Sequence, residues 1–112
     1  MKSKRDLKKQ IKYICGDLVG ECMLIGEIVT EDKQDDVAQL IIDIAVLQES
    51  TLRNVTFAFD KSVRDFASVH EYHKARSAYY RAAYGALHEK FNASLNECVH
   101  RMNDLAGLSQ KA

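Results

Sequence analysis

The stretch YRAAYGALHEKFNASLNECVHRMNDL, residues 80 to 105, decides the fold class. Its apolar side chains recur every three or four residues in near-heptad spacing: Tyr80, Tyr84, Leu87, Phe91, Leu95, Cys98, Met102 and Leu105. This period is that of one face of an α-helix, whereas a strand alternates every second residue. Gly107 follows at the position of a C-terminal cap. The spacing therefore predicts one long helix over about residues 68–106.

The start and the continuity of this helix each leave an alternative open. Two capping signals precede it, Ser62 with Asp65 and Ser68 with Glu71, and either could begin a helix. Gly85 is the one breaker inside the stretch, and a glycine costs only about 1 kcal/mol relative to alanine in a helix. We therefore prefer a continuous helix.

Two further apolar stripes lie upstream of this stretch. The first predicts a helix over about residues 4–28, begun by the capping pair Ser3 and Asp6, and consists of Leu7, Ile11, Ile14, Leu18, Cys22 and Ile25. The polar segment TEDKQDD, residues 30 to 36, is interpreted as a turn. The second stripe then predicts a helix over about residues 35–57 and consists of Val37, Leu40, Ile41, Ile44, Leu47, Thr51, Leu52 and Val55.

The chain as a whole is expected to be all-α. It has 112 residues, the size of one domain, and its lack of proline favours long helices. We predict a single domain over residues 1–112, folded as a three-helix antiparallel bundle with a long third helix. The alternative is a four-helix up-down bundle, in which the third helix breaks near Gly85.

The unequal helix lengths indicate a partner molecule. At 1.5 Å per residue, the third helix is nearly 60 Å long and the other two are about 33 to 38 Å long. The overhang is rich in tyrosine, and small or apolar residues also lie on the sides of the first two helices away from their core stripes. We therefore expect a homodimer, or a complex with another helical protein, with an interface drawn from Gly16, Gly20, Met23, Ile42, Val46, Tyr72, Tyr79, Tyr80 and Tyr84.

The charges sum to zero but are unevenly placed. Residues 1–12 carry six basic and one acidic side chain, and residues 21–49 carry eight acidic and one basic. Clustered cations can bind phosphates, so nucleic-acid binding is an alternative function. The candidate anion contacts are Lys2, Lys4, Arg5, Lys8, Lys9 and Lys12.

Two histidines suggest a metal site, which we do not favour. His70 and His73 lie in HEYHK, residues 70 to 74, one position short of the HExxH spacing of zinc proteases. A third ligand one turn away would come from Phe66, Ala67, Lys74 or Ser77, none of which is a preferred ligand. A metal-binding bundle remains an alternative.

Catalytic patterns are lacking. ECVH, residues 97 to 100, matches one unit of a di-iron bundle, but that chemistry needs two such units and the predicted helix turns them outward. Cys15, Cys22 and Cys98 lie on or beside apolar stripes, where a thiol usually packs as a small hydrophobe. No glycine-rich phosphate loop or serine elbow occurs. We expect a non-catalytic helical interaction or oligomerisation module that needs no cofactor.

Two observations concern the compartment. No apolar run approaches the roughly 18 residues that a membrane span needs. The odd number of cysteines, three, without a CxxC pair, is typical of reduced thiols. We therefore expect a cytoplasmic protein.

The segment DLKKQIKYICGDLVGEC, residues 6 to 22, resembles the start of a group of small uncharacterised bacterial helical proteins. The similarity extends to FNASLNECVHRMNDL, residues 91 to 105, so it covers parts of two predicted helices. The resemblance implies no activity and no catalytic residue.

Overall fold

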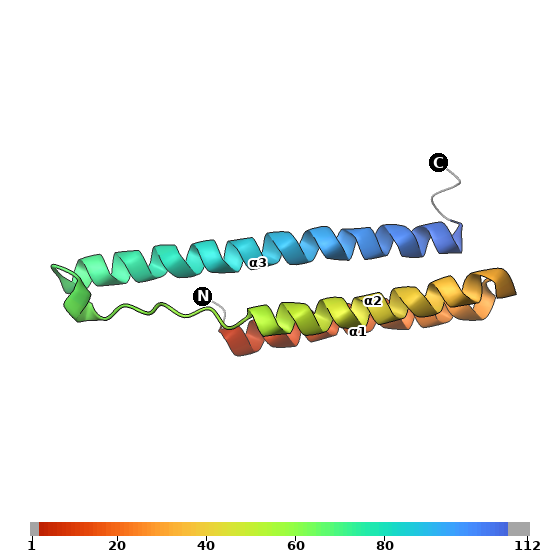
Figure 1. Ribbon diagram of the computed structural model, residues 1–112, viewed down its shortest axis with the longest axis horizontal. Helices are drawn as coiled ribbons and strands as arrows, with labels where there is room; N and C mark the ends of the chain where they lie inside the picture. The colour runs from red at the N-terminus through yellow and green to blue at the C-terminus, as the bar shows by residue number, and fades with distance from the viewer. Residues whose placement is uncertain (1–2, 108–112) are drawn as a thin grey trace.

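Three long helices form the fold of residues 3–107, the part of the chain that the computed structural model describes. They are α1 (Lys4–Ile28), α2 (Glu31–Asn54) and α3 (Val69–Ala106), with a short 3-10 helix, η1 (Val63–Asp65), between α2 and α3. The α1–α2 hairpin packs along one half of α3, and the other half of α3 extends beyond it (Figure 1). The predicted three-helix bundle with a long third helix is therefore confirmed.

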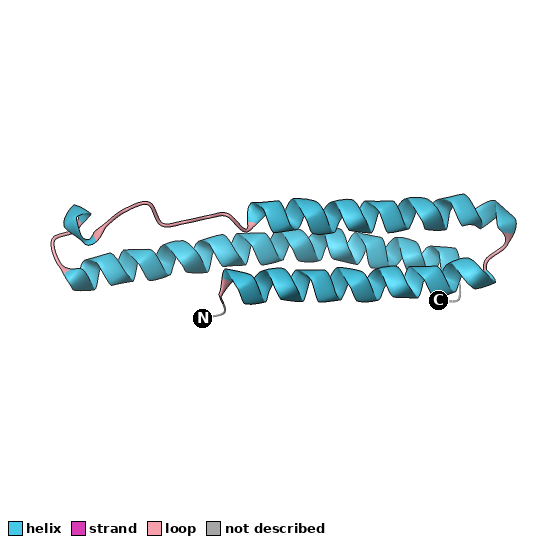
Figure 2. Cartoon of the chain, turned by 90° about the horizontal axis from the view of Figure 1, so that it is seen from below, coloured by secondary structure: helices cyan, strands magenta, loops and turns pink. Residues whose placement is uncertain are grey.

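The hairpin presents one of its faces to α3. In Figure 1, α3 lies to one side of both α1 and α2, and in the perpendicular view of Figure 2 it projects between them. The helices thus form a triangular arrangement, in which α1 and α3 are parallel and α2 is antiparallel to both. No described segment of the chain covers the face of the hairpin that points away from α3.

A two-residue turn joins α1 to α2. Gln34 stabilises it, because its side-chain amide donates to the carbonyl oxygens of Gly26, at 2.6 Å, and Val29, at 3.2 Å. Both carbonyl groups lie at the end of α1, where no N–H group of the helix is placed to donate to them. The predicted start of the second helix at residue 35 was wrong by four residues. Glu31 and Asp32 occupy the first turn of α2, where acidic side chains interact favourably with the helix dipole.

The segment between α2 and α3, residues 55–68, is called the connector below. The connector runs along the overhanging half of α3 (Figure 2). Because the chain leaves the helical path to do so, α2 ends at Asn54 rather than at the predicted residue 57. Both predicted capping signals are used. Ser62 and Asp65 form a capping box at η1, and the Ser68 hydroxyl accepts from the Glu71 amide at 3.2 Å at the start of α3.

Helix α3 runs for 38 residues without a break. A Cβ atom added at Gly85 would have no neighbour within 4 Å, so this glycine marks neither a bend nor a close contact. The helix ends at Gly107, which adopts φ 80° and so provides the left-handed C-cap. The alternative of a four-helix bundle broken near Gly85 is therefore wrong.

The core lies where the three helices overlap. Ile44, Leu40 and Ile11 are at most 2% exposed and form its centre. Most of the remaining buried members come from the predicted stripes: Leu7, Leu18 and Cys22 of α1, Val55 after α2, and Leu87, Phe91, Cys98 and Met102 of α3. Cys15, beside the first stripe, is also buried. Each Å² of apolar surface that is removed from water stabilises the fold by about 25 cal/mol, so the packing of the three helices in this core is the main source of stability.

Candidate interaction surface

The tyrosines of the α3 overhang contact phenylalanines of the connector. The Phe57 ring meets Tyr84 edge-on with centroids 4.8 Å apart, and the Phe59 ring lies 5.5 Å from Tyr79 and 5.9 Å from Tyr72. All of these rings are half-buried. The cluster is completed by Phe66 and Tyr80, and the Phe59 amide donates to the Tyr80 hydroxyl at 3.3 Å.

Two cations extend this aromatic cluster. The Lys4 ammonium lies 5.3 Å from the centroid of the Phe57 ring, and the Arg76 guanidinium lies 4.9 Å from that of Tyr80. The connector thus contacts Tyr72, Tyr79, Tyr80 and Tyr84, for which the sequence predicted contacts with a second molecule. A signal for this was present in FAFD, residues 57 to 60. Alternation in an extended segment places Phe57 and Phe59 on one side of the chain, a pattern that was not used to predict these contacts.

The outer face of the hairpin is the face of α1 and α2 that points away from α3. On α1 it is a stripe of exposed residues spaced by three or four positions: Arg5, Lys9, Lys12, Gly16, Gly20, Met23 and Glu27. On α2 it is a second exposed stripe with the same spacing: Glu31, Asp35, Ala38, Ile42, Ala45 and Glu49. Met23 is 58% exposed and Ile42 is 55% exposed, so neither contributes to the core.

The two stripes place their small and apolar residues at the same height. Gly26 lies against Val37, because a Cβ atom on this glycine would be 3.3 Å from Val37 Cγ1. Since the helices are antiparallel, moving eight residues away from this contact along each helix brings Ala45 level with Leu18. Gly16 and Gly20 flank that level. The centre of the outer face therefore consists of small and apolar residues and carries no charged side chain.

Val46, predicted for the same interface, lies elsewhere. It borders the junction of α2 with α3, in a hollow that is also lined by Leu47, Ser94 and Glu97. There Arg101 of α3 donates to Asp43 of α2 at 2.9 Å. Hydrogen bonds from the Gln39 side chain and then from Arg101 lower the pKa of Asp43 below its ordinary value. This ion pair between helices was not predicted from the sequence.

The two ends of the outer face carry opposite charge. Arg5, Lys8, Lys9 and Lys12 line an open hollow on α1 to which no described segment outside α1 and its cap contributes. Lys4 instead lies at the aromatic cluster, and Lys2 lies outside the described residues. At the opposite end of the hairpin, Glu27, Glu31 and Asp35 are exposed. The uneven charge seen in the sequence thus becomes two poles of one surface.

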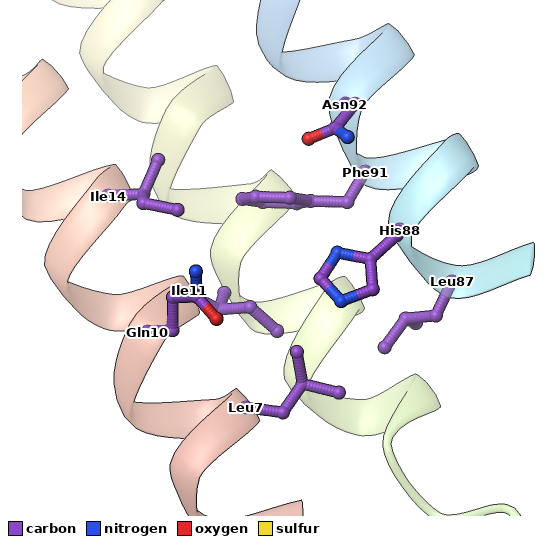
Figure 3. A pocket seen from close by; sticks show the side chains of 8 residues that line it. All are labelled: Leu7, Gln10, Ile11, Ile14, Leu87, His88, Phe91 and Asn92. Atoms are coloured by element: carbon purple, nitrogen blue, oxygen red, sulfur yellow. The ribbon is translucent and has the colours of Figure 1, made fainter. Parts of the chain in front are cut away.

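A separate hollow of about 200 Å³ lies between α1 and α3 (Figure 3). Leu7, Ile11, Ile14, Leu87 and Phe91 form its apolar lining, and Gln10, His88 and Asn92 complete it. In Figure 3 the amide of Gln10 and the imidazole of His88 point toward the hollow from opposite helices. It exists because α1 and α3 contact each other only lightly, while each packs closely on α2.

The histidines and cysteines give no metal centre among residues 3–107. No group of three His, Cys, Asp or Glu side chains in that range could hold a metal ion. His70 and His73 are exposed in the first turns of α3, and His100 lies 3.5 Å from Asp104 on the surface. Cys15, Cys22 and Cys98 are free and buried in the core, and burial raises the pKa of each thiol. A buried thiol with a raised pKa is a poor nucleophile.

Among the helices of residues 3–107, none combines the length and the apolar composition that crossing a bilayer requires. Comparison with protein-family models, with curated proteins and with solved structures finds no match to this chain.

Proposed function

We propose that this protein is a non-catalytic helical oligomerisation module, which associates with another copy of itself through the outer face of the α1–α2 hairpin. The observation that carries the proposal is the exposure of Gly16, Gly20, Met23, Ile42 and neighbouring small side chains at the centre of that face. Small residues allow two helical backbones to approach closely, and apolar ones gain free energy when water is excluded.

The size of the face supports the proposal. Helix α2 has 24 residues, so at 1.5 Å per residue the face is about 36 Å long, and two helices about 9 Å apart make it about 18 Å wide. Covering it would bury roughly 650 Å² on each copy, or about 1,300 Å² in total, which falls within the range of stable specific interfaces. The three free thiols are consistent with a protein that works in the cytoplasm.

The overhang of α3 plays no part in this proposal. Its tyrosines already contact the connector, so the reason for placing a partner there no longer applies. The outer face differs because no described segment lies against it.

The experiment is a mass measurement by light scattering at tens of micromolar protein. We expect two chains for the wild type and one chain for Gly20→Leu, because a leucine at the centre of the face keeps the helices apart. Ala93→Leu is the matched control, since it adds a side chain of the same size on the exposed side of α3 and should leave the mass at two chains. A wild type of one chain, or a Gly20→Leu variant that keeps two, would refute the proposal.

A further inference from the structure

The α1 stripe of the outer face changes the sign of its charge from one end to the other. On α1, cations at Arg5, Lys9 and Lys12 are followed by the uncharged centre and then by Glu27. The first turn of α2 adds Glu31 at that same end. A second copy turned end over end therefore brings its acidic end, with Glu27 and Glu31, to the basic end of the first, with Arg5 and Lys9.

We infer that the dimer is antiparallel, with its two-fold axis crossing the interface at the level of Leu18, between Gly16 and Gly20. This inference rests on the proposed function and specifies how the second copy binds. The axis position follows from the spacing. Lys9 and Glu27 lie nine residues on either side of residue 18, which is about 14 Å along the helix in each direction. Residue i of α1 then faces residue 36 minus i of the second copy.

This register pairs charged residues at both ends of the α1 stripe with residues of opposite charge, while Lys12 falls opposite Leu24 at the margin of the uncharged centre. Lys9 faces Glu27 of the second copy, and by symmetry the same pair forms at the other end. Gly16 faces Gly20 of the second copy, so the two α1 helices cross where neither backbone carries a Cβ atom. Arg5 faces Glu31, in the first turn of α2 of the second copy. Tyr13, which is 63% exposed, faces Met23 of the second copy.

The parallel arrangement is disfavoured by the same charges. It would place Lys9 against Lys9 and Glu27 against Glu27, and like charges in an interface cost free energy. A different helical protein would match both ends of the stripe only if its own charges ran from acidic to basic in the same order. A reversed second copy has this order already. A second copy is therefore the partner that the surface fits best.

The test reverses one charge at a time and then both. Lys9→Glu and Glu27→Lys should each raise the dimer dissociation constant by at least on the order of tenfold, because the affected pair occurs twice and changes from attractive to repulsive. An equimolar mixture of the two variants should restore a mass of two chains. The double variant Lys9→Glu with Glu27→Lys should restore a homodimer by itself, because each new glutamate then faces a new lysine.

Two controls separate this result from other effects. The Lys9 ammonium lies 5.9 Å from the Tyr13 ring centroid, and Lys9→Glu removes that contact as well. The double variant also lacks it, so its recovery would show that the pairing with residue 27 matters. Glu89→Lys reverses an exposed charge on α3, away from the outer face, and should leave the dissociation constant unchanged.

The outcomes distinguish the inference from the proposed function. A wild-type dimer that Gly20→Leu disrupts, but that the charge reversals leave unchanged, overturns the antiparallel register and leaves the module intact. A double variant that stays as weak as the single variants does the same. A wild type of one chain overturns both, including the case in which that single chain binds a DNA duplex through Arg5, Lys9 and Lys12.

Discussion

Replacing Phe59 by alanine should release the connector from the overhanging half of α3 without unfolding the bundle. Phe59 holds the connector in place through ring contacts with Phe66, Tyr72 and Tyr79, at centroid distances of 6.1, 5.9 and 5.5 Å. Truncating a fully buried phenylalanine costs about 3 to 5 kcal/mol, and Phe59 is half-buried. We therefore expect the free energy of local opening to fall by about 2 kcal/mol, half of the full cost.

Amide hydrogen exchange measures this opening segment by segment. A loss of about 2 kcal/mol corresponds to exchange roughly 30-fold faster in residues 69–84, because 1.4 kcal/mol is a factor of ten. Exchange in residues 87–102, which pack in the core, should stay the same. Val63→Ala is the control, since Val63 lies in the same connector, is 43% exposed and is outside the aromatic cluster. Unchanged exchange in residues 69–84 of the Phe59→Ala variant would refute the view that the connector covers the overhang.

Two further predictions concern the bundle itself. Phe91→Ala should lower the free energy of unfolding, measured by urea denaturation, by about 3 to 4 kcal/mol, because Phe91 is 5% exposed and truncating a buried phenylalanine typically costs about 3 to 5 kcal/mol; a loss below about 1 kcal/mol would contradict its place in the core. Asp43→Asn should flatten the acid limb of the stability curve. Hydrogen bonds from Gln39 and then Arg101 lower the pKa of Asp43 in the folded protein. The carboxylate therefore contributes its full stability above the ordinary aspartate pKa of about 4, and this contribution is lost as the pH falls through the lowered value. Urea titrations of wild type and variant between about pH 6 and pH 2 should therefore converge at the acid end, and parallel curves would show that this pair is not linked to folding.

The fold could be predicted because the apolar period and the caps agree. Each stripe that was identified in the sequence supplies most of the buried residues of one helix, and Ser3, Ser68 and Gly107 cap helices where the sequence places them. Local signals of this kind depend on neighbours within one or two turns of the chain. They therefore survive in the structure almost unchanged.

The start of α2 could not be found in this way. Residues 31 to 34 are polar, and a polar first turn has the composition of a loop. What makes it helical is the contact of Gln34 with the end of α1, together with the match between Glu31, Asp32 and the helix dipole. The first of these depends on the arrangement of two helices, which the sequence of one segment does not contain.

The candidate surface was predicted in part for the same reason. Gly16, Gly20, Met23 and Ile42 are exposed as expected, because the side opposite a core stripe can be read from helical period alone. The environment of the tyrosines depends instead on the path of the connector, and that of Val46 on which residues of α3 lie beside α2. Neither is encoded in the spacing of residues along one helix.

The charges of α1 connect its sequence to the proposed assembly. Cations near a helix N-terminus and acids near a C-terminus both oppose the helix dipole, typically by about 0.3 to 1 kcal/mol each at exposed sites. Helix α1 carries Arg5, Lys8 and Lys9 in its first two turns, where only Asp6 has the favourable sign, and Glu27 in its last turn, where no basic residue occurs. Within the described chain no salt bridge compensates these side chains. In an antiparallel pair, the acidic end of each α1 lies beside the basic end of the other, so charges that are unfavourable in one copy become favourable in two.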